Sequence, residues 1–416
     1  MRLRHIGWSL ACIAAFVWAP AHATAQAPAS TQDAVAASPL TVYLVTIGPG
    51  DAVWERFGHN ALWIHDARTG QDIWWNWGLF SFSQEGFLLR LARGDMLYSM
   101  GGREMRAELA QYRAQQRDVW AQQLNLTAAQ ALELDRFVRR NAQPANRDYI
   151  YDYYEDNCST RVRDAIDRVL GGALEAHFSA RPVATTWRIQ TRRHVEVSSL
   201  TDVGVALVLG RPGDREITAW QQMFLPLELR RHLGSLLLEG PDGAMRPLVL
   251  DELHLIDAGR TPPPDMASPR WPAMLLLGLV VAFGALLLGV AGRRSGLARI
   301  ALALVVGAWS LLAGVGGFLL SAAWFTDHDF WVPNENLLQA SPLSLVLALV
   351  VLGAVLRPSL WQAASRISRW VAALALIGVL VKLVPLGLAQ DNLQVLALAL
   401  PVHLAAAWAV RQASEA

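Results

Sequence analysis

The last third of the chain carries a series of apolar stretches, each close to the ~20 residues that a helix needs to cross a bilayer. These stretches restrict the possible folds, because backbone polar groups in lipid must bond within their own segment. We therefore predict an all-α transmembrane domain of about five helices over residues 271–411. The expected helices cover residues 271–291, 298–323, 337–356, 370–388 and 393–410.

The charges between these stretches predict their orientation, since arginine and lysine accumulate on the cytoplasmic side of membrane helices. The connections after the first and third stretches and the C-terminal end hold Arg293, Arg294, Arg299, Arg357, Arg366, Arg369 and Arg411. The opposite connections hold only acidic charges: Asp327, Asp329, Glu335 and Asp391. We expect the C-terminus in the cytoplasm of a bacterium, the membrane to be the inner one, and the preceding half of the chain in the periplasm.

The start of the chain supports export. Arg2 and Arg4 precede a short apolar run, which is followed by small residues in an A-x-A pattern. This order is typical of a secretory signal peptide, which we place at residues 1–27. Residues 28–39 are rich in Ala, Gln, Pro and Ser and are expected to form a linker.

Composition excludes several kinds of function. The formal net charge of +1 gives no general attraction to nucleic acid. Of the two cysteines, Cys12 lies in the predicted signal peptide, so the mature protein keeps only Cys158, too few for a disulfide or a cysteine-rich zinc site. The only lysine is Lys382, which argues against a Ser–Lys dyad in the periplasmic half. No HExxH, GxSxG, P-loop or CxxC motif is present, so we expect no metal and no cofactor.

Residues 40–265 mix strand and helix patterns and predict an α+β periplasmic domain. Strands are expected at 40–47, 61–64 and 73–77, with a hairpin turn at 66–70 and further strand structure at 195–209. Helices are expected at 84–93, 103–115, 127–141, 158–170 and 223–238.

Cys158 is the candidate nucleophile. Asp156 or Asn157 is a good N-cap, which would place Cys158 in the first turn of the helix at 158–170. The partial positive charge and free N–H groups of a helix N-terminus stabilise a thiolate and can hold a developing oxyanion. A buried, inert thiol is the alternative reading of a single cysteine.

A thiol nucleophile needs a base, and the candidate is His59, which follows Gly58 at the start of a predicted strand. Asn76, on the next strand across a short hairpin, is the candidate for the residue that orients this imidazole. Asn60 and His65 are alternatives for that third position.

The connection at 324–341 carries aromatic residues that suit a lipid–water interface, among them Trp324 and Trp331. Its polar residues His328 and Asn336 lie at the level of a lipid ester, and we expect both to contact substrate. A solvated connector with aromatic anchors is the alternative.

Several blocks of the sequence resemble the DUF4105 family, whose members carry the Lnb-type N-terminal periplasmic domain. These blocks are residues 57–62 (FGHNAL), 75–78 (WNWG), 156–161 (DNCSTR), 209–214 with 223–226, and 326–342 in the membrane half. The order of histidine before cysteine is similar to that of circularly permuted papain-like folds, the NlpC/P60-related group. The resemblance implies that Cys158 is the nucleophile and His59 the base. We expect Asn157 and Arg161, which flank the thiol, to bind substrate.

Lnb-type proteins are lipoprotein N-acyltransferases, so the resemblance implies a thiol acyltransferase with two partners, a membrane phospholipid and a diacylglyceryl lipoprotein. The acyl chain would pass through a thioester on Cys158 to the lipoprotein α-amine. Two alternatives stay open. One is an NlpC/P60-like cysteine peptidase or amidase acting on cell-wall peptides, and the other is a membrane scaffold without catalytic activity.

Overall fold

The computed structural model describes residues 38–240, 243–383 and 389–415. The predicted signal peptide and all of the predicted linker except Ser38 and Pro39 lie outside these residues. From Ser38 onward the described chain forms one compact unit, in which an α+β domain precedes a helical region.

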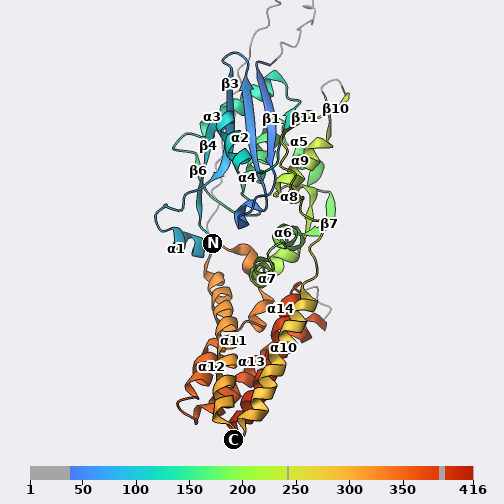
Figure 1. Cartoon of the computed structure of the whole chain (residues 1–416). Coiled ribbons are helices and arrows are strands. Elements are labelled where there is room, and N and C mark those ends of the chain that lie inside the picture. The colour runs from blue at the N-terminus through green and yellow to red at the C-terminus, as the bar shows by residue number, and fades with distance from the viewer. Residues whose placement is uncertain (1–37, 241–242, 384–388, 416) are drawn as a thin grey trace, which may run out of the picture. The chain divides into compact units, whose positions relative to one another are not determined.

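A seven-stranded antiparallel sheet organises the α+β domain, with the strand order β11-β5-β1-β2-β3-β4-β6 (Figure 1). The strands are β1 (Leu40–Ile47), β2 (His59–Asp66), β3 (Gln71–Leu79), β4 (Leu97–Glu104), β5 (Val119–Leu124), β6 (Asp148–Ile150) and β11 (Val249–Ile256). Short two-stranded sheets are formed by β7 (Pro182–Thr186) with β8 (Glu216–Thr218) and by β9 (Leu237–Glu239) with β10 (Met245–Pro247). The first three strands and the hairpin turn between β2 and β3 lie where the sequence predicted them.

Nine α-helices accompany the strands in the described part of this domain. They are α1 (Phe87–Arg93), α2 (Met105–Ala114), α3 (Ala128–Asn141), α4 (Cys158–Val169), α5 (Ala173–Phe178), α6 (Trp187–Val195), α7 (Ser199–Val208), α8 (Ala219–Gln222) and α9 (Pro226–Gly234). The helix α4 packs against β2 and β3, with Val162 and Ile166 fully buried in one core with Leu62 and Trp77. This packing carries the first turn of α4 to the ends of the strands that hold the candidate base.

The strand structure predicted at residues 195–209 is wrong, because Val195 ends the helix α6 and Ser199–Val208 form the helix α7. Ser198 is its N-cap, and its hydroxyl accepts the backbone N–H of Thr201 at 3.3 Å. A short run of β-branched residues fits a strand and a buried helix equally well, and here the cap selects the helix.

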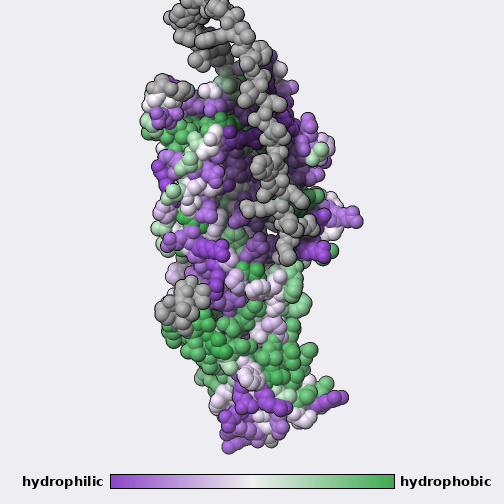
Figure 2. Space-filling view, turned by 180° about the vertical axis from the view of Figure 1, so that it is seen from behind, coloured by the Kyte–Doolittle hydropathy of each residue, from purple (hydrophilic) through white to green (hydrophobic). Residues whose placement is uncertain are grey.

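In the residues that the structure describes, five apolar helical segments follow, each long enough to cross a membrane. The helices are α10 (Trp271–Gly292), α11 (Gly296–Ala322), α12 (Leu343–Gly353), α13 (Leu360–Leu383) and α14 (Leu393–Ser414). Apolar side chains gather on the surface over these helices (Figure 2). Small residues allow close packing of α10 on α14, since a Cβ on Gly278 would lie 2.5 Å from the Leu398 carbonyl oxygen.

The third predicted span, at residues 337–356, has a different form from that expected. The α-helix begins only at Leu343, after Pro342, and a 3₁₀ turn η5 (Glu335–Leu338) precedes it. A proline supplies no N–H to a preceding turn and favours the first positions of a helix, which explains the late start. The whole span runs over Glu335–Gly353.

Asparagine and glutamine side chains tie the connections between these helices to the C-terminal end of α7. Asn334 donates to the carbonyls of Leu207 and Val208, and Asn336 donates to those of Ala206 and Leu207, at 2.8–3.0 Å. These bonds satisfy carbonyls that the end of a helix leaves without partners. An ion pair lies beside them, with Lys382 Nζ 2.5 Å from Glu335 Oε2.

Candidate active site

Cys158 is the first residue of α4 and is buried. Asn157 is the N-cap, and its side-chain oxygen accepts the N–H groups of Ser159 at 2.8 Å and Thr160 at 3.0 Å. The Asn157 amide group also donates to the carbonyls of Tyr153 and Phe224, at 3.0 and 3.1 Å. Of the two predicted caps, the structure therefore selects Asn157, and these bonds fix the thiol at the positive end of the helix.

His59 is the first residue of β2, and its side chain bonds to Asn76 and lines the same pocket as Cys158. Its Nε2 lies 3.1 Å from Oδ1 of Asn76, which stands on the neighbouring strand β3. A carboxamide oxygen only accepts hydrogen bonds, so Nε2 carries the ring proton in this arrangement. The other nitrogen, Nδ1, is left to accept the proton of the thiol.

Two glycines give the histidine and the thiol the room they need. Gly78 has φ +87°, and a Cβ built on it would lie 3.4 Å from Cβ of Cys158 and 3.9 Å from Cε1 of His59. Gly58 has φ +82°, and its Cβ would lie 2.6 Å from the carbonyl oxygen of Ile47. The backbone at Gly58 therefore approaches Ile47 closely, and this approach sets the position of His59.

The electrostatics of the pair favour a thiolate. Burial alone would raise the pKa of Cys158, but the charge and hydrogen bond of His59, with the N–H groups of Asn60 and Ser159, lower it overall. Burial alone would lower the pKa of His59, but the negative charge and hydrogen bond of Cys158 and the bond from Asn76 raise it overall. Each group thus stabilises the charged form of the other.

Alkylation of Cys158 by iodoacetamide is expected to follow an apparent pKa below the ~8.5 of a free cysteine, because the thiolate is the reactive form. The His59→Ala variant loses the imidazole charge that lowers the pKa of Cys158, while the burial that raises this pKa remains. The midpoint of the rate–pH profile should therefore move to higher pH. His65→Ala is the matched control, since His65 lies on the same strand and bonds to Asp72 at 2.9 Å. A profile that is identical in the native protein and in His59→Ala would refute the pairing.

Two pockets meet at Cys158. One has a volume of about 290 Å³ and is lined by His59, Asn76 and charged residues of α2 and its surroundings, including Arg103, Glu108 and Arg117. The other has a volume of about 240 Å³ and is lined mainly by aromatic and aliphatic side chains. These are Trp54, Phe57, Tyr151, Tyr153, Tyr154, Val205, Val208, Leu209, Phe224, Pro226 and Trp331. The thiol therefore lies between a polar and an apolar space, each large enough for part of a ligand.

The sequence analysis missed Arg117, a buried guanidinium in the polar pocket. Its side chain is 5% exposed, and its Nε donates to the Gly48 carbonyl at 2.9 Å. Burial lowers the pKa of Arg117, while the negative charge of Cys158 is among the influences that raise it. A single arginine in an arginine-rich chain gives no signal of its own, and only the sheet brings it near the thiol.

The remaining candidates for the third position lie elsewhere. Asn60 is next to His59 on β2, so its side chain projects to the other face of the sheet, where it bonds to Thr46 Oγ1 at 2.9 Å. His65 bonds to Asp72 near the far end of the hairpin. Among the candidates considered, only Asn76 bonds to His59.

The structure separates the residues expected to bind substrate. Arg161 forms a two-bond ion pair with Asp156 and stacks over the ring of Tyr149 at 3.9 Å. Asn336 uses its whole amide group inside the protein, accepting from Asn392 at 2.8 Å as well as donating to α7. Neither residue is among the described residues that line the two pockets at Cys158.

His328 lies behind a pocket wall. Its ring stacks on Trp331, with centroids 4.3 Å apart, and its Nε2 lies 3.2 Å from the carbonyl oxygen of Leu91. Trp331 itself lines the apolar pocket together with Tyr153. The connection at residues 324–341 therefore contributes Trp331 to the site, and not His328. Of the residues predicted to bind substrate, Asn157 lines the same apolar pocket.

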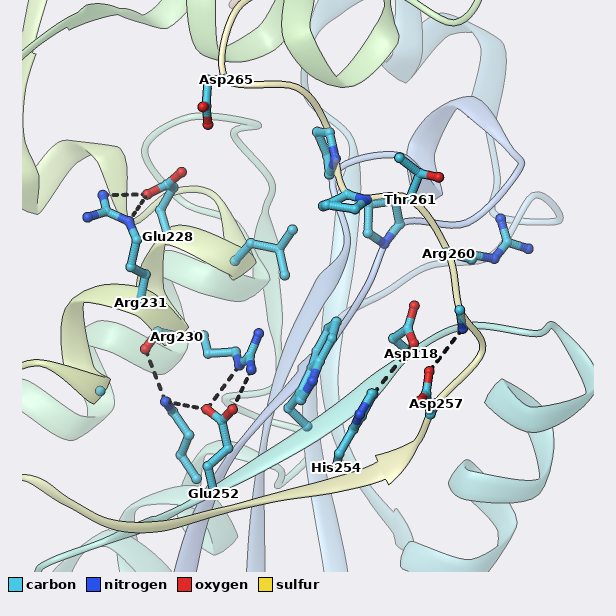
Figure 3. Close-up of a pocket in the computed structure, with 18 of the residues that line it drawn as sticks. Asp118, Glu228, Arg230, Arg231, Glu252, His254, Asp257, Arg260, Thr261 and Asp265 are labelled. Carbon is cyan, nitrogen blue, oxygen red and sulfur yellow. Dashed lines mark hydrogen bonds and ion pairs between the residues drawn. The ribbon is translucent and has the colours of Figure 1, made fainter.

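A larger pocket of about 740 Å³ lies between β5, β11 and α9, away from the thiol (Figure 3). It is rich in charge, with Glu252 paired to Arg230 and Glu228 paired to Arg231. The ligand atoms of Asp118, His254 and Asp257 lie within 4.8 Å of one another there, close enough to share a cation. The sequence analysis did not single out this group, because more than half of the domain separates Asp118 from the other two.

Comparison with known proteins finds a match in the N-terminal part of the chain. Residues 27–193 match the family model described as the Lnb N-terminal periplasmic domain, and this stretch contains His59, Asn76 and Cys158. The predicted resemblance is confirmed for this stretch, which contains the first three of the sequence blocks. No curated protein and no solved structure matches the chain. With the five apolar segments, the match shows a multi-pass membrane protein with a periplasmic N-terminal domain.

Proposed function

We propose that this protein is a thiol acyltransferase of the bacterial inner membrane, which moves an acyl chain from a phospholipid to the α-amine of a diacylglyceryl lipoprotein. The observation that carries the proposal is the group Cys158, His59 and Asn76, in which His59 bonds to Asn76 and lines one pocket with the thiol, in a domain joined to five apolar helical segments. The base His59 precedes the nucleophile Cys158 in the chain, as in circularly permuted papain-like enzymes. We therefore extend the proposal to that fold.

In the first half-reaction, Sγ of Cys158 attacks the ester carbonyl carbon of the phospholipid. His59 accepts the thiol proton at Nδ1 and passes it to the leaving oxygen as the carbon–oxygen bond breaks, which releases a lysophospholipid. The N–H group of Cys158 at the positive end of α4 stabilises the negative charge that develops on the carbonyl oxygen, while the Asn157 cap occupies the N–H groups of Ser159 and Thr160.

In the second half-reaction, the neutral α-amine of the lipoprotein attacks the thioester carbonyl. The carbon–sulfur bond breaks, a carbon–nitrogen bond forms, and His59 carries the proton from the amine to the thiolate. The membrane segments hold the thiol beside both lipid partners, which raises their effective concentration.

The proposal predicts a covalent intermediate. Incubated with phospholipid and no acceptor, the reconstituted protein should gain the mass of one acyl chain on the peptide that contains Cys158. Neutral hydroxylamine should remove this mass, because it cleaves thioesters and leaves amides intact. Intact and peptide mass spectrometry measure both results.

The alternatives give different adducts. Trapping of a cell-wall peptide on Cys158 in place of an acyl chain would favour the peptidase or amidase, for which the same three residues would serve. The absence of any adduct with either substrate would contradict both enzymes and favour a scaffold. In cells, loss of the gene should remove the N-acyl chain from lipoprotein N-termini.

A further inference from the structure

We infer that the phospholipid donor binds across Cys158 with one acyl chain in the apolar pocket and its phosphate in the polar pocket, facing Arg117. This inference rests on the proposed function and extends it to a binding mode. The two pockets share Trp54, Gly58, Tyr151 and Cys158, so one bound molecule can reach both from the thiol. A phospholipid has the required form, because its esters lie between an anion and hydrocarbon chains.

The apolar pocket is suited to a hydrocarbon chain. Tyr154, Trp187 and Phe224 form one aromatic cluster with Phe330 behind it, and Val205 and Val208 of α7 close another side. Each methylene group that is buried against such walls contributes favourably to binding. A peptide substrate would place polar backbone groups there at a cost, because the walls offer them few partners.

The pocket also lies near the end of a candidate membrane span, Gly296–Phe325. Trp331 follows Phe325, the end of the 3₁₀ turn after α11, by six residues, which spans at most ~20 Å of extended chain. Trp54 at the junction of both pockets is 61% exposed and contacts Phe82, which is equally exposed. Exposed aromatic residues of this kind suit the lipid–water interface and give a chain an apolar route to the thiol.

The polar pocket contains an unused donor for an anion. Nη2 of Arg117 is buried and has no hydrogen-bond partner among the residues that the structure describes. Glu55 is the nearest acidic partner, at 3.9 Å from Nη1, too far for a hydrogen bond. A buried guanidinium N–H that lacks a partner is costly, and a phosphate oxygen would supply the missing charge-assisted bond.

The test measures the rate of acyl-enzyme formation by the full-length protein in detergent micelles, with each variant compared on paired donors. Val208→Trp and Val205→Phe should lower the ratio of rates for dihexadecanoyl over dioctanoyl phosphatidylglycerol by ~10-fold or more, because they shorten the pocket. Leu200→Trp is the matched control, since Leu200 lies on the same helix, is 85% exposed and lines neither pocket among the described residues. Acylation by the short-chain donor shows that each variant is folded.

Arg117→Gln should lower the ratio of rates for phosphatidylglycerol over diacylglycerol with the same chains by ~10- to 100-fold, the value of a bond to a charged group. Arg113→Gln, an exposed site on α2, removes the same charge outside the pocket and should leave this ratio unchanged. Arg117→Lys should restore part of the ratio, because it keeps the charge.

The outcomes separate the two proposals. If phosphatidylglycerol acylates the native protein but either ratio is unchanged in its pocket variants, this binding mode is overturned and the proposed function stands. If no donor acylates the native protein, the proposed function fails and the binding mode with it. A fall in both ratios, with unchanged controls, supports the binding mode.

Discussion

Replacement of Cys158 by alanine is expected to abolish acyl transfer and to leave a folded, membrane-inserted protein. The change removes one sulfur atom from a buried site, a small loss of volume, while the Asn157 cap that begins α4 does not involve the thiol. Cys158→Ser should also be inactive, because an alcohol is a much weaker nucleophile in a site that stabilises a thiolate. Lipoprotein N-termini analysed by mass spectrometry, in cells that carry only the variant, report the activity.

The control for folding is protease resistance of the periplasmic domain together with the yield of membrane-inserted protein. Full activity in Cys158→Ala, at native levels of folded protein, would contradict both the acyltransferase and the cysteine peptidase or amidase. The Cys158→Ser variant adds a second reading, since residual ester-linked acylation of the introduced hydroxyl would show that the site still binds donor.

Replacement of His59 by alanine is expected to lower the turnover by ~10²–10⁴-fold, the usual effect of losing a general base. The variant keeps its thiol and both pockets, so donor binding should change far less than turnover. The rate of acyl-enzyme formation under saturating phospholipid measures the first effect, and the donor concentration at half-maximal rate measures the second.

His65→Ala is the matched control here as well, because it removes an imidazole from the same strand without touching Cys158. The turnover of Asn76→Ala should lie between those of His59→Ala and His65→Ala, since Asn76 holds the ring of His59 and takes no proton itself. Equal activity of His59→Ala and His65→Ala would mean that another group accepts the thiol proton.

Local patterns predicted most of the fold and the central part of the site. The β2–β3 hairpin was readable from alternating residues and a turn, and its antiparallel register pairs Ala61 with Asn76, which brings Asn76 beside His59. The cap before Cys158 was readable from the sequence of α4 alone. Each of these features depends on residues close together in the chain, where propensity and periodicity are informative.

The features that were missed depend on contacts between distant segments. Arg117 reaches the thiol only because β5 pairs with β1, which in turn pairs with β2. Asn336 was predicted to bind substrate because it is polar and at the level of the interface. It instead bonds to carbonyls at the end of α7, a helix that the sequence analysis took for a strand. Without that helix, the need for a capping amide could not be seen.

The ion pair of Lys382 with Glu335 has a consequence for side reactions. A thioester acylates any neutral amine that reaches it, whereas a guanidinium stays protonated and does not react. The chain has 36 basic residues, yet Lys382 is its only lysine, and its ammonium is held by Glu335 and by the carbonyl of Gln390. An acyltransferase of the proposed kind would thereby be nearly free of internal side-chain amines that could intercept its acyl group, and its arginine-rich composition would protect it against self-modification.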